Sequence, residues 1–563
     1  MTASDRRELG LGDDVVSPHP AGKSWLVTQQ PVVLAAIMGL SLLVAMWDFN
    51  PVMEQCDDCA EYIILARSIA QGRWMQLINQ PDSRRSDRLP FGFPLLLAGI
   101  ERLAPGNMLA MKALNVALYA LAMPVLYLLL MRHLPPPSAL AVTLLALLNS
   151  LLLPFSHQVM SEVLYLLISL LTMLCLEWAE EQSEARRRRG IAGGAILAVA
   201  ATTIRSIGVA LFGGAVLWYL ARKRYRPALL VAGLYLGVLL ALHLLGAGVF
   251  GSFYVEETTK LSPVAPEFGS LKWTDLPSRV LANLKVYGLS HLSPALFPIP
   301  RVVPAAFPKV AVMLVTIPLI LLILIGWGQE AAKRGLPPLY VIGYLGILAV
   351  RPPLFAYERY FAPIVPFLLW FLFTGMGEVA RRMWRLSGRR LPRTMAGAAD
   401  PWLAGTACFL ALLALGRDYE LKAVHRHHHH YWTSYLEAGE WLREHSPSDS
   451  VILARKPYSL HLLTNRKTVR VDIFGAPEQV IDLIEKYHVT FVILDHFSTG
   501  RTVQRPPALV KAIDSHQEMF EPLYTSPTSP TTIVLRVRRE ALAGEGSPSL
   551  RGSPKSSGQA DTP

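Results

Sequence analysis

Long apolar runs separated by short polar segments occupy the chain from residue 31 to residue 416. A helix needs about 20 apolar residues to cross the hydrocarbon core of a bilayer, and about eleven runs approach that length. They lie at 31–48, 107–131, 136–155, 160–179, 190–205, 206–221, 227–250, 308–328, 338–351, 360–380 and 401–416. The pattern predicts a polytopic α-helical membrane domain over 31–416, preceded by a polar, disordered segment over 1–30.

After residue 417 the pattern changes to short β-type runs that alternate with helical segments. The β-type runs are 451–454, 469–471, 491–495 and 532–537, and the helical segments are 431–445 and 477–488. This alternation predicts a small α/β domain over 417–540. The Gly/Ser/Pro-rich residues 541–563 are expected to form a flexible tail.

Clusters of arginine and lysine follow alternate apolar runs, at 186–189, 222–226, 333–334 and 381–393. Because basic loops stay on the cytoplasmic side of a membrane, we expect a cytoplasmic N-terminus. The loops 49–106 and 251–307 and the C-terminal α/β domain are then extracytoplasmic. Within the first of these loops, the amphipathic stretch 58–72 and the short apolar stretch 93–100 are predicted to form interfacial helices.

The composition and the net charge exclude some functional classes. Hydrophobic residues make up 52% of the 563 residues and charged residues only 17%, which excludes a soluble protein of this length. The net charge of +12 comes from short clusters between apolar runs and not from a basic face of a folded domain. We therefore expect no nucleic-acid partner.

The chain has four cysteines. Cys56 and Cys59 flank two aspartates on the predicted oxidising side, where the spacing fits both a disulfide and a thiol-redox site. Cys175 and Cys408 lie in apolar runs and are expected to be small core residues. The run 425–430 contains five histidines, but consecutive histidines do not make a defined metal site, so we interpret it as a solvated linker.

The first predicted extracytoplasmic loop carries two motifs in order, Asp58-x-Ala60-x-Tyr62-x-x-x-Ala66-Arg67-x-x-Ala70-x-Gly72 and Pro90-x-Gly92-x-Pro94-Leu95-Leu96. They resemble the corresponding loop of GT-C-type glycosyltransferases, which include bacterial aminoarabinose lipid A transferases and protein O-mannosyltransferases. Three further matches lie at the same predicted membrane face: Ser161-Glu162, Thr203-Ile204-Arg205 and Glu358-Arg359-Tyr360-Phe361-Ala362-Pro363.

This resemblance implies transfer of a sugar from a polyprenyl-phosphate carrier to an extracytoplasmic glycan, lipid or protein acceptor, with inversion at the anomeric carbon. It also implies a location in a bacterial plasma membrane. Such a reaction needs a carboxylate that takes a proton from the acceptor or orients it. It also needs cations that hold the departing lipid phosphate.

Asp58 is the candidate general base, because it precedes Tyr62 by four residues as the acid of the family does. Its alternative role is that of a helix N-cap. Glu162 is the second catalytic candidate, although an acid in the first turn of a helix also favours the helix dipole. The family often has Asp-Glu where this chain has Asp58-Cys59. It stays open whether Asp57 substitutes for the missing acid in the substrate pocket or binds a divalent cation, and no other cofactor is expected.

Arg88, Arg205 and Arg359 are the candidates for binding the donor phosphate. The alternative for Arg88 and Arg205 is that they reach to the membrane interface, and Arg359 could instead pair with Glu358. Tyr62 and Tyr360 are the candidate pocket residues, with an aromatic belt as the alternative for Tyr360.

Two other functional classes are alternatives to the glycosyltransferase. A transporter or flippase of lipid-linked sugars would place ionisable residues near the bilayer midplane and show repeated halves, whereas the acids and arginines here gather at one predicted face. A membrane thiol-redox protein would need a second cysteine pair or a quinone site, and neither is evident in the sequence.

Overall fold

The computed structural model describes residues 29–53, 56–246, 258–261, 269–297, 309–353, 356–386, 405–416, 430–471, 476–499, 502–503 and 505–538. The predicted disordered segment up to residue 28, the histidine run up to residue 429 and the predicted tail 541–563 lie outside these residues.

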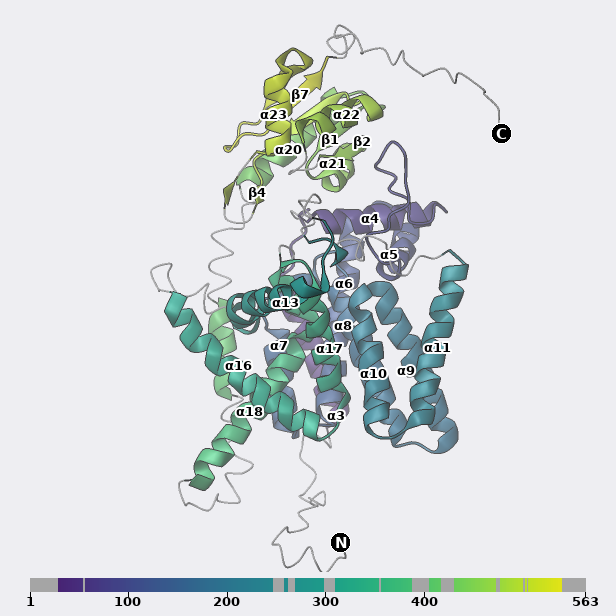
Figure 1. Cartoon of the computed structure of the whole chain (residues 1–563), viewed down its shortest axis with the longest axis vertical. Coiled ribbons are helices and arrows are strands. Elements are labelled where there is room, and N and C mark those ends of the chain that lie inside the picture. The colour runs from purple at the N-terminus through teal and green to yellow at the C-terminus, as the bar shows by residue number, and fades with distance from the viewer. Residues whose placement is uncertain are drawn as a thin grey trace, which may run out of the picture.

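The first and larger part of the chain is a bundle of helices (Figure 1). Its long helices are α3 Gln30–Trp47, α6 Met108–Leu130, α7 Pro136–Leu147, α8 Glu162–Glu180, α9 Glu184–Ile204, α10 Val209–Ala221, α11 Tyr225–Leu244, α16 Lys309–Ala332, α17 Leu336–Val350 and α18 Val365–Leu386. Shorter elements are η1 Leu153–Ser156, η2 Ser206–Gly208, η4 Trp273–Asp275, α13 Leu276–Lys285, η5 Val286–His291, α14 Leu292–Leu296 and η7 Glu358–Ile364.

Six of the described helices are long and apolar enough to cross a membrane, judged by length and composition. They are Gln30–Trp47, Met108–Leu130, Glu162–Glu180, Tyr225–Leu244, Met313–Ala332 and Glu358–Leu386. Shorter apolar helices are Pro136–Leu147, Ser206–Ala221, Leu336–Val350 and Gly405–Gly416. The mostly helical, apolar domain is confirmed, and the number of about eleven spans stays a prediction.

The predicted run 136–155 is wrong as a single helix. Helix α7 ends at Leu147, and the chain resumes as the short helix η1. Between them the Asn149 Oδ1 atom accepts hydrogen bonds from the backbone N–H groups of Leu151 and Leu152, at 3.1 and 2.9 Å. This side chain competes with the helical hydrogen-bond ladder and turns the chain, which hydrophobicity alone does not reveal.

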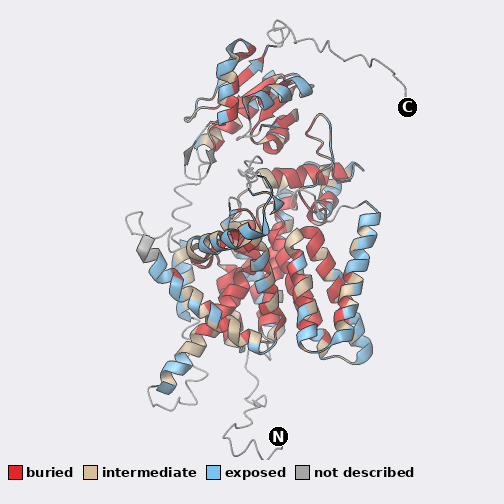
Figure 2. Ribbon diagram, in the orientation of Figure 1, coloured by how far each residue is buried: buried red, intermediate tan, exposed pale blue. Residues whose placement is uncertain are grey.

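The outer helices expose apolar side chains, as expected for helices that face lipid. Buried residues gather in the centre of the bundle and along α4 Asp57–Ala70, whereas α11 is mostly exposed and α16 is mostly exposed or intermediate (Figure 2). On α11, Leu229 is 72% exposed and Leu240 is 59% exposed. Contiguous apolar surface of this kind is rare on soluble monomers and agrees with a membrane environment.

Two short helices of the loop 49–106 lie at the end of the bundle that is nearest to the C-terminal domain (Figure 1): α4, and α5 Gly92–Leu103. A Cβ atom on Gly92 would lie 2.8 Å from the backbone of Thr203, so glycine lets α5 approach the end of α9 closely. Helix α4 was predicted as an amphipathic interfacial helix, and ten of its 14 residues are buried. The C-terminal domain packs against this helix, which accounts for part of its burial, and its position at the membrane interface stays a prediction.

The C-terminal domain is a mixed sheet with helices on both faces, which confirms the predicted small α/β fold. Its strands are β1 Val451–Ala454, β2 Lys467–Arg470, β3 Phe491–Leu494, β6 Phe520–Thr525 and β7 Ile533–Val537, in the order β2-β1-β3-β7-β6. Strand β1 is parallel to β2 and β3, and β7 is antiparallel to β3 and β6. Helices α20 His430–His445 and α21 Pro457–Thr464 pack on one face, and α22 Pro477–Tyr487 and α23 Pro507–Ser515 pack on the other. The short elements β4 Ser498–Thr499, β5 Thr502–Val503 and η8 Gln517–Met519 complete it.

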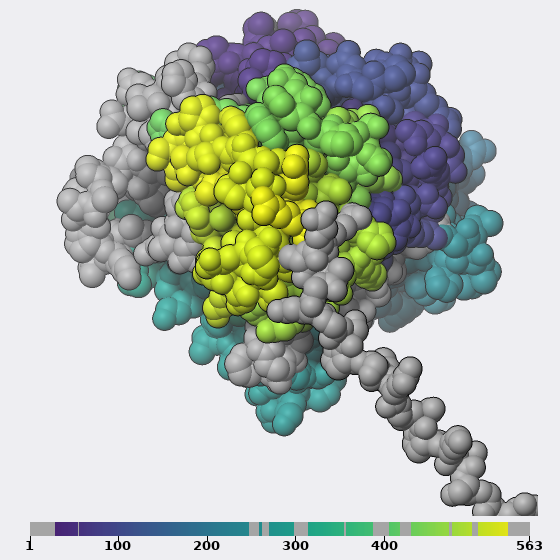
Figure 3. Space-filling view, turned by 90° about the horizontal axis from the view of Figure 1, so that it is seen from above, coloured from purple at the N-terminus to yellow at the C-terminus, as the bar shows by residue number. Residues whose placement is uncertain are grey.

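The C-terminal domain lies directly on the loop that carries α4. Helix α21 packs against α4, and Tyr458 of α21 is only 5% exposed and belongs to the hydrophobic core of the bundle. The backbone N–H of Thr468 donates to the Asn79 carbonyl oxygen at 2.7 Å, and Lys467 Nζ donates to the carbonyl oxygen of Ile78 at 2.8 Å. Seen from above, this domain covers much of that face of the molecule (Figure 3).

Candidate active site beneath the C-terminal domain

Asp58 stands in the first turn of α4 and is held by two arginines from distant segments. One carboxylate oxygen accepts a hydrogen bond from Arg88, and the other lies 2.7 Å from Arg359 Nη2. The Asp58 side chain is 17% exposed, so it borders solvent. Burial raises the pKa of the Asp58 carboxyl, but the guanidinium charges of Arg88 and Arg359 outweigh this effect and hold its pKa well below the usual range.

A second ion pair lies beside the first. Glu162, the first residue of α8, is fully buried, and its Oε1 atom lies 2.7 Å from Nη1 of Arg205 at the end of α9. The same Arg205 nitrogen donates to Ser161 Oγ at 3.1 Å, and Ser161 Oγ lies 3.0 Å from the Tyr62 hydroxyl. Because Arg359 also interacts electrostatically with Glu162, the two ion pairs form one polar cluster.

The aromatic ring of Tyr360 contacts two of the cations near this cluster. The Arg359 guanidinium carbon lies 5.4 Å from the centre of the Tyr360 ring, and that of Arg351 lies 4.6 Å from it. Such distances are typical of cation–π contacts. Arg351 follows α17, and its carbonyl oxygen accepts a hydrogen bond of 2.6 Å from Asn283 of α13. The structure thus brings two arginines to the ring of Tyr360, of which Arg351 was not among the predicted site residues.

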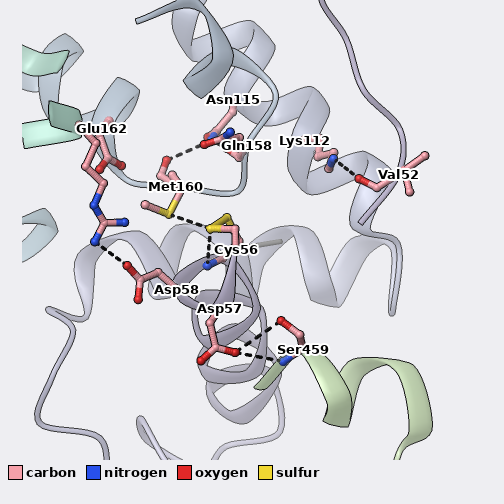
Figure 4. Close-up of a disulfide and its surroundings, with 12 residues drawn as sticks. Val52, Cys56, Asp57, Asp58, Lys112, Asn115, Gln158, Met160, Glu162 and Ser459 are labelled. Carbon is pink, nitrogen blue, oxygen red and sulfur yellow. Dashed lines mark hydrogen bonds and ion pairs between the residues drawn. A yellow bond between two sulfur atoms is a disulfide. The ribbon is translucent and has the colours of Figure 1, made fainter. Parts of the chain in front are cut away.

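Asp57 does not share the surroundings of Asp58. Its Oδ1 atom accepts weak hydrogen bonds from Ser459 of α21, 3.4 Å from the hydroxyl and 3.5 Å from the backbone N–H. Asp58 extends towards the side of Glu162, whereas Asp57 points to Ser459 (Figure 4). Consecutive helical residues are about 100° apart around the helix axis, which explains this divergence.

The arrangement gives a divalent cation few ligands. Among the described residues, no three His, Cys, Asp or Glu side chains come together as metal ligands. Asp57 and Asp58 contact different groups, and both oxygens of Asp58 already face guanidinium groups. The residues present therefore do not fit a cation between the two aspartates, and no catalytic step is assigned to one.

Burial of Asp57 raises the pKa of its carboxyl, although the charges of Lys456, Arg470 and Arg88 act against this rise. Two of these cations belong to the C-terminal domain. The contact between α21 and α4 is therefore also electrostatic, and it joins the C-terminal domain to the helix turn that carries Asp58.

Sequence reasoning missed Glu61, which lies one turn after Asp58. It is fully buried, and its two oxygens accept hydrogen bonds from Arg88 Nη1 at 2.9 Å and from Ser86 Oγ at 3.1 Å. A signal was present, since residues three apart lie on the same side of a helix. Tyr458 was also missed, because its approach to α4 depends on how the two domains pack.

Cys56 and Cys59 form a disulfide across the start of α4 (Figure 4). Cys56 is also the N-cap residue of the helix, with its sulfur 3.2 Å from the backbone nitrogen of Cys59. Cys175 and Cys408 are free. The disulfide closes the turn on which Asp57 and Asp58 stand, which favours a structural role.

Replacing Cys56 and Cys59 together with serine should leave the rate of sugar transfer nearly unchanged. The disulfide closes a very short loop, which limits its stabilisation to about 2 kcal/mol, and serine is itself a good N-cap residue. Transfer assays at matched membrane levels, with thermal denaturation in detergent, test this expectation. Loss of transfer in a protein that folds normally would favour a thiol-redox role.

The helical arrangement of the chain is similar to that of solved structures of GT-C glycosyltransferases. It is similar to the structure of ArnT from Cupriavidus metallidurans in the apo state, with a TM-score of 0.53 and 12% sequence identity, over 91% of this chain and 99% of that one. It is also similar to the archaeal oligosaccharyltransferase AglB from Archaeoglobus fulgidus, with a TM-score of 0.51 and 14% identity, over 84% and 70% of the two chains. At these identities the likeness shows the fold.

Residues 97–269 match the family model of dolichyl-phosphate-mannose-protein mannosyltransferases. Together with the fold, this match confirms the predicted resemblance, and it identifies the chain as a glycosyltransferase. No curated protein sequence matches the chain.

Proposed function

We propose that the chain transfers a sugar from a polyprenyl-phosphate-linked donor to an extracytoplasmic glycan, lipid or protein acceptor, with inversion, and that Asp58 is the general base. The observation that carries this proposal is the ion-paired cluster in which Asp58 lies against Arg88 and Arg359 at the end of an apolar bundle. One carboxylate and several cations are what such a transfer requires. The related ArnT has been seen bound to undecaprenyl phosphate, and AglB in complex with an inhibitory peptide and a dolichol-phosphate.

The cluster couples donor binding to activation of the base. The phosphate of the donor offers Arg88 and Arg359 an alternative anionic partner, since guanidinium groups bind phosphate well. As these arginines turn to the phosphate, the pKa of Asp58 rises towards its usual value and the carboxylate becomes a stronger base.

The transfer then proceeds as a single displacement. Asp58 takes the proton of an acceptor hydroxyl while the acceptor oxygen attacks the anomeric carbon. The bond between that carbon and the phosphate oxygen breaks, and the lipid phosphate leaves with the electron pair. Arg88 and Arg359 stabilise its charge, and Arg205 with Glu162 forms the adjacent wall.

We assign the cluster to the extracytoplasmic face. Helix α10 begins four residues after Arg205, near the cluster, and ends before the basic turn that contains Arg222. Its 13 residues separate these two ends by about 20 Å. Arg222 Nε lies 3.3 Å from the carbonyl oxygen of Arg334, so two basic turns meet at the far end. The positive-inside rule then favours a cytoplasmic position for that end.

The remaining assignments follow from this orientation. We propose a bacterial plasma-membrane protein with a cytoplasmic N-terminal segment 1–30, a membrane-embedded catalytic domain 31–416, an extracytoplasmic domain 417–540 and a tail 541–563. The polar cluster favours an enzyme over a transporter, because Glu162 begins α8 and Arg205 ends α9. Ionisable residues at helix ends suit a site that opens at the membrane surface.

Transfer of radiolabelled sugar in right-side-out and inverted vesicles tests the function. A panel of polyprenyl phosphosugars serves as donors, with the matching nucleotide sugars as controls. We expect transfer from lipid-linked donors alone, to acceptors on the outer face of right-side-out vesicles. Transfer from nucleotide sugars would contradict the donor class, and movement of the lipid-linked sugar across the membrane without transfer would indicate a transporter.

A further inference from the structure

Arg88 contacts two carboxylates with different parts of its guanidinium group. One terminal nitrogen, Nη1, lies 2.9 Å from Glu61 Oε2, and the other, Nη2, bonds to Asp58. Glu61 is fully buried, whereas the side chain of Asp58 is 17% exposed. The planar guanidinium therefore has two different partners. Glu61 is an inner partner that solvent and substrate do not reach, and Asp58 is an outer partner at the edge of the site.

We infer that Glu61 is a positioning residue that aims Arg88 at the donor phosphate. This inference rests on the proposed function, in which Arg88 exchanges Asp58 for the phosphate. Because Glu61 holds Nη1 throughout, only Nη2 has to change its partner. Glu61 touches neither the sugar nor the phosphate, and it acts through the direction and the charge of Arg88.

The carboxylate of Glu61 is itself held in place. Its second oxygen accepts a hydrogen bond from Ser86 Oγ at 3.1 Å, and the Ser86 backbone N–H donates to the carbonyl oxygen of Met75 at 2.8 Å. Tyr458 of the C-terminal domain is nearly buried and interacts electrostatically with Glu61 and Arg88. A buried acid needs such partners, because an isolated charge in this position would be strongly destabilising.

The charge of Glu61 matters as well as its shape. Burial raises the pKa of Glu61, as do the nearby charges of Asp57 and Asp58, and the charge of Arg88 opposes this rise. A neutral side chain at position 61 would hold Nη1 of Arg88 by a weaker hydrogen bond, so the guanidinium would no longer be fixed in its direction. Ordering Arg88 on the donor phosphate would then cost more free energy, so the affinity for the donor should fall.

The test compares four proteins: the wild type, Glu61→Gln, Arg88→Gln and the double variant. Binding of undecaprenyl phosphate to the purified full-length protein is measured together with the kinetics of sugar transfer. Glu61→Gln alone should weaken binding roughly 10- to 100-fold, as expected for a charged hydrogen bond, and affect kcat much less. In the Arg88→Gln background the same change should add less than about two-fold, because its effect passes through Arg88.

Two further variants provide a control and an alternative to Glu61→Gln. Glu101→Gln is the matched control, because Glu101 of the neighbouring helix α5 pairs with Arg67 at 3.6 Å and not with Arg88. It should leave binding unchanged. Ser86→Ala removes the hydrogen bond to Glu61 and a longer contact of 3.4 Å with the backbone N–H of Arg88, but it keeps both carboxylates, so it applies if Glu61→Gln fails to fold. It should weaken binding by roughly 2- to 12-fold, again only when Arg88 is present.

Equal losses from Glu61→Gln with and without Arg88 would overturn the inference and leave the proposed function intact. A wild-type protein that neither binds undecaprenyl phosphate nor transfers sugar would overturn the proposed function, and the inference with it.

Discussion

Asparagine in place of Asp58 should lower the rate of sugar transfer by about 100- to 10,000-fold, which is the usual contribution of a positioned general base. Asparagine keeps the size of the side chain and one carbonyl oxygen, but it cannot take the proton of the acceptor. It also removes the charge that pairs with Arg88 and Arg359. Donor affinity should therefore stay the same or rise, since the phosphate no longer competes with a carboxylate. Rates and donor affinity are measured at matched membrane levels.

The neighbouring acid provides the control. Asp57→Asn removes an equal charge from the same helix turn, but Asp57 accepts its hydrogen bonds from Ser459, whereas Asp58 pairs directly with Arg88 and Arg359. We expect it to reduce transfer much less than Asp58→Asn does. If Asp57→Asn reduced transfer more than Asp58→Asn does, Asp57 would be the base. If Asp58→Asn were as active as the wild type, Glu162 would become the candidate base.

The role of Asp58 as general base also predicts how the rate of the wild type depends on pH. The arginines hold the pKa of Asp58 well below its usual range, so this carboxyl stays ionised as the pH falls from 7 to 5. Protonation of Asp58 in the free enzyme should therefore cause no loss of kcat/KM in that interval. A group with a lowered pKa loses its charge only as the pH falls through that lower value.

Alanine in place of Arg205 should lower the free energy of unfolding by about 3–5 kcal/mol, the usual effect of breaking a buried ion pair. The reason is the fully buried Glu162, whose carboxylate would lose a guanidinium partner at 2.7 Å. The apparent melting temperature in detergent should fall clearly. Adding Glu162→Gln should restore much of the loss, because the double variant no longer buries an uncompensated charge.

Arg188→Ala is the matched control on the same helix. Arg188 pairs with Glu184 at 3.0 Å, but both side chains are largely exposed, so the loss should stay below about 1 kcal/mol. If Arg205→Ala were as harmless as Arg188→Ala, the ion pair with Glu162 would contribute little to the folded state. Arg205 would then remain a candidate for the donor phosphate only.

The broad class of the protein was readable from local patterns. Apolar runs predict membrane helices because a bilayer demands a certain length, and alternating short runs predicted the C-terminal α/β fold. Ordered motifs such as Asp58 to Gly72 pointed to the GT-C resemblance. Each of these signals lies within a short stretch of chain and needs no knowledge of distant contacts.

The partners of the site residues could not be predicted from these local patterns. The arginines that hold Asp58 come from positions 88 and 359, and helix α4 is covered by residues about 400 positions later in the chain. Hydrophobic pattern could not foresee the break after α7 either, because the side chain of Asn149 decides it. Asp57 and Asp58 look alike in the sequence, and only their directions around the helix separate them.

The sequence by itself thus determined the apolar helices, the appended α/β domain and the list of charged candidate site residues, because hydrophobicity, chain length and motif order are local properties. Only the tertiary structure decided which acid meets which arginine, that Glu61 anchors Arg88, and that Tyr458 and Ser459 of the C-terminal domain reach α4. The physical reason is that ion pairs and hydrogen bonds act over a few ångströms, and the packing of distant segments sets those distances.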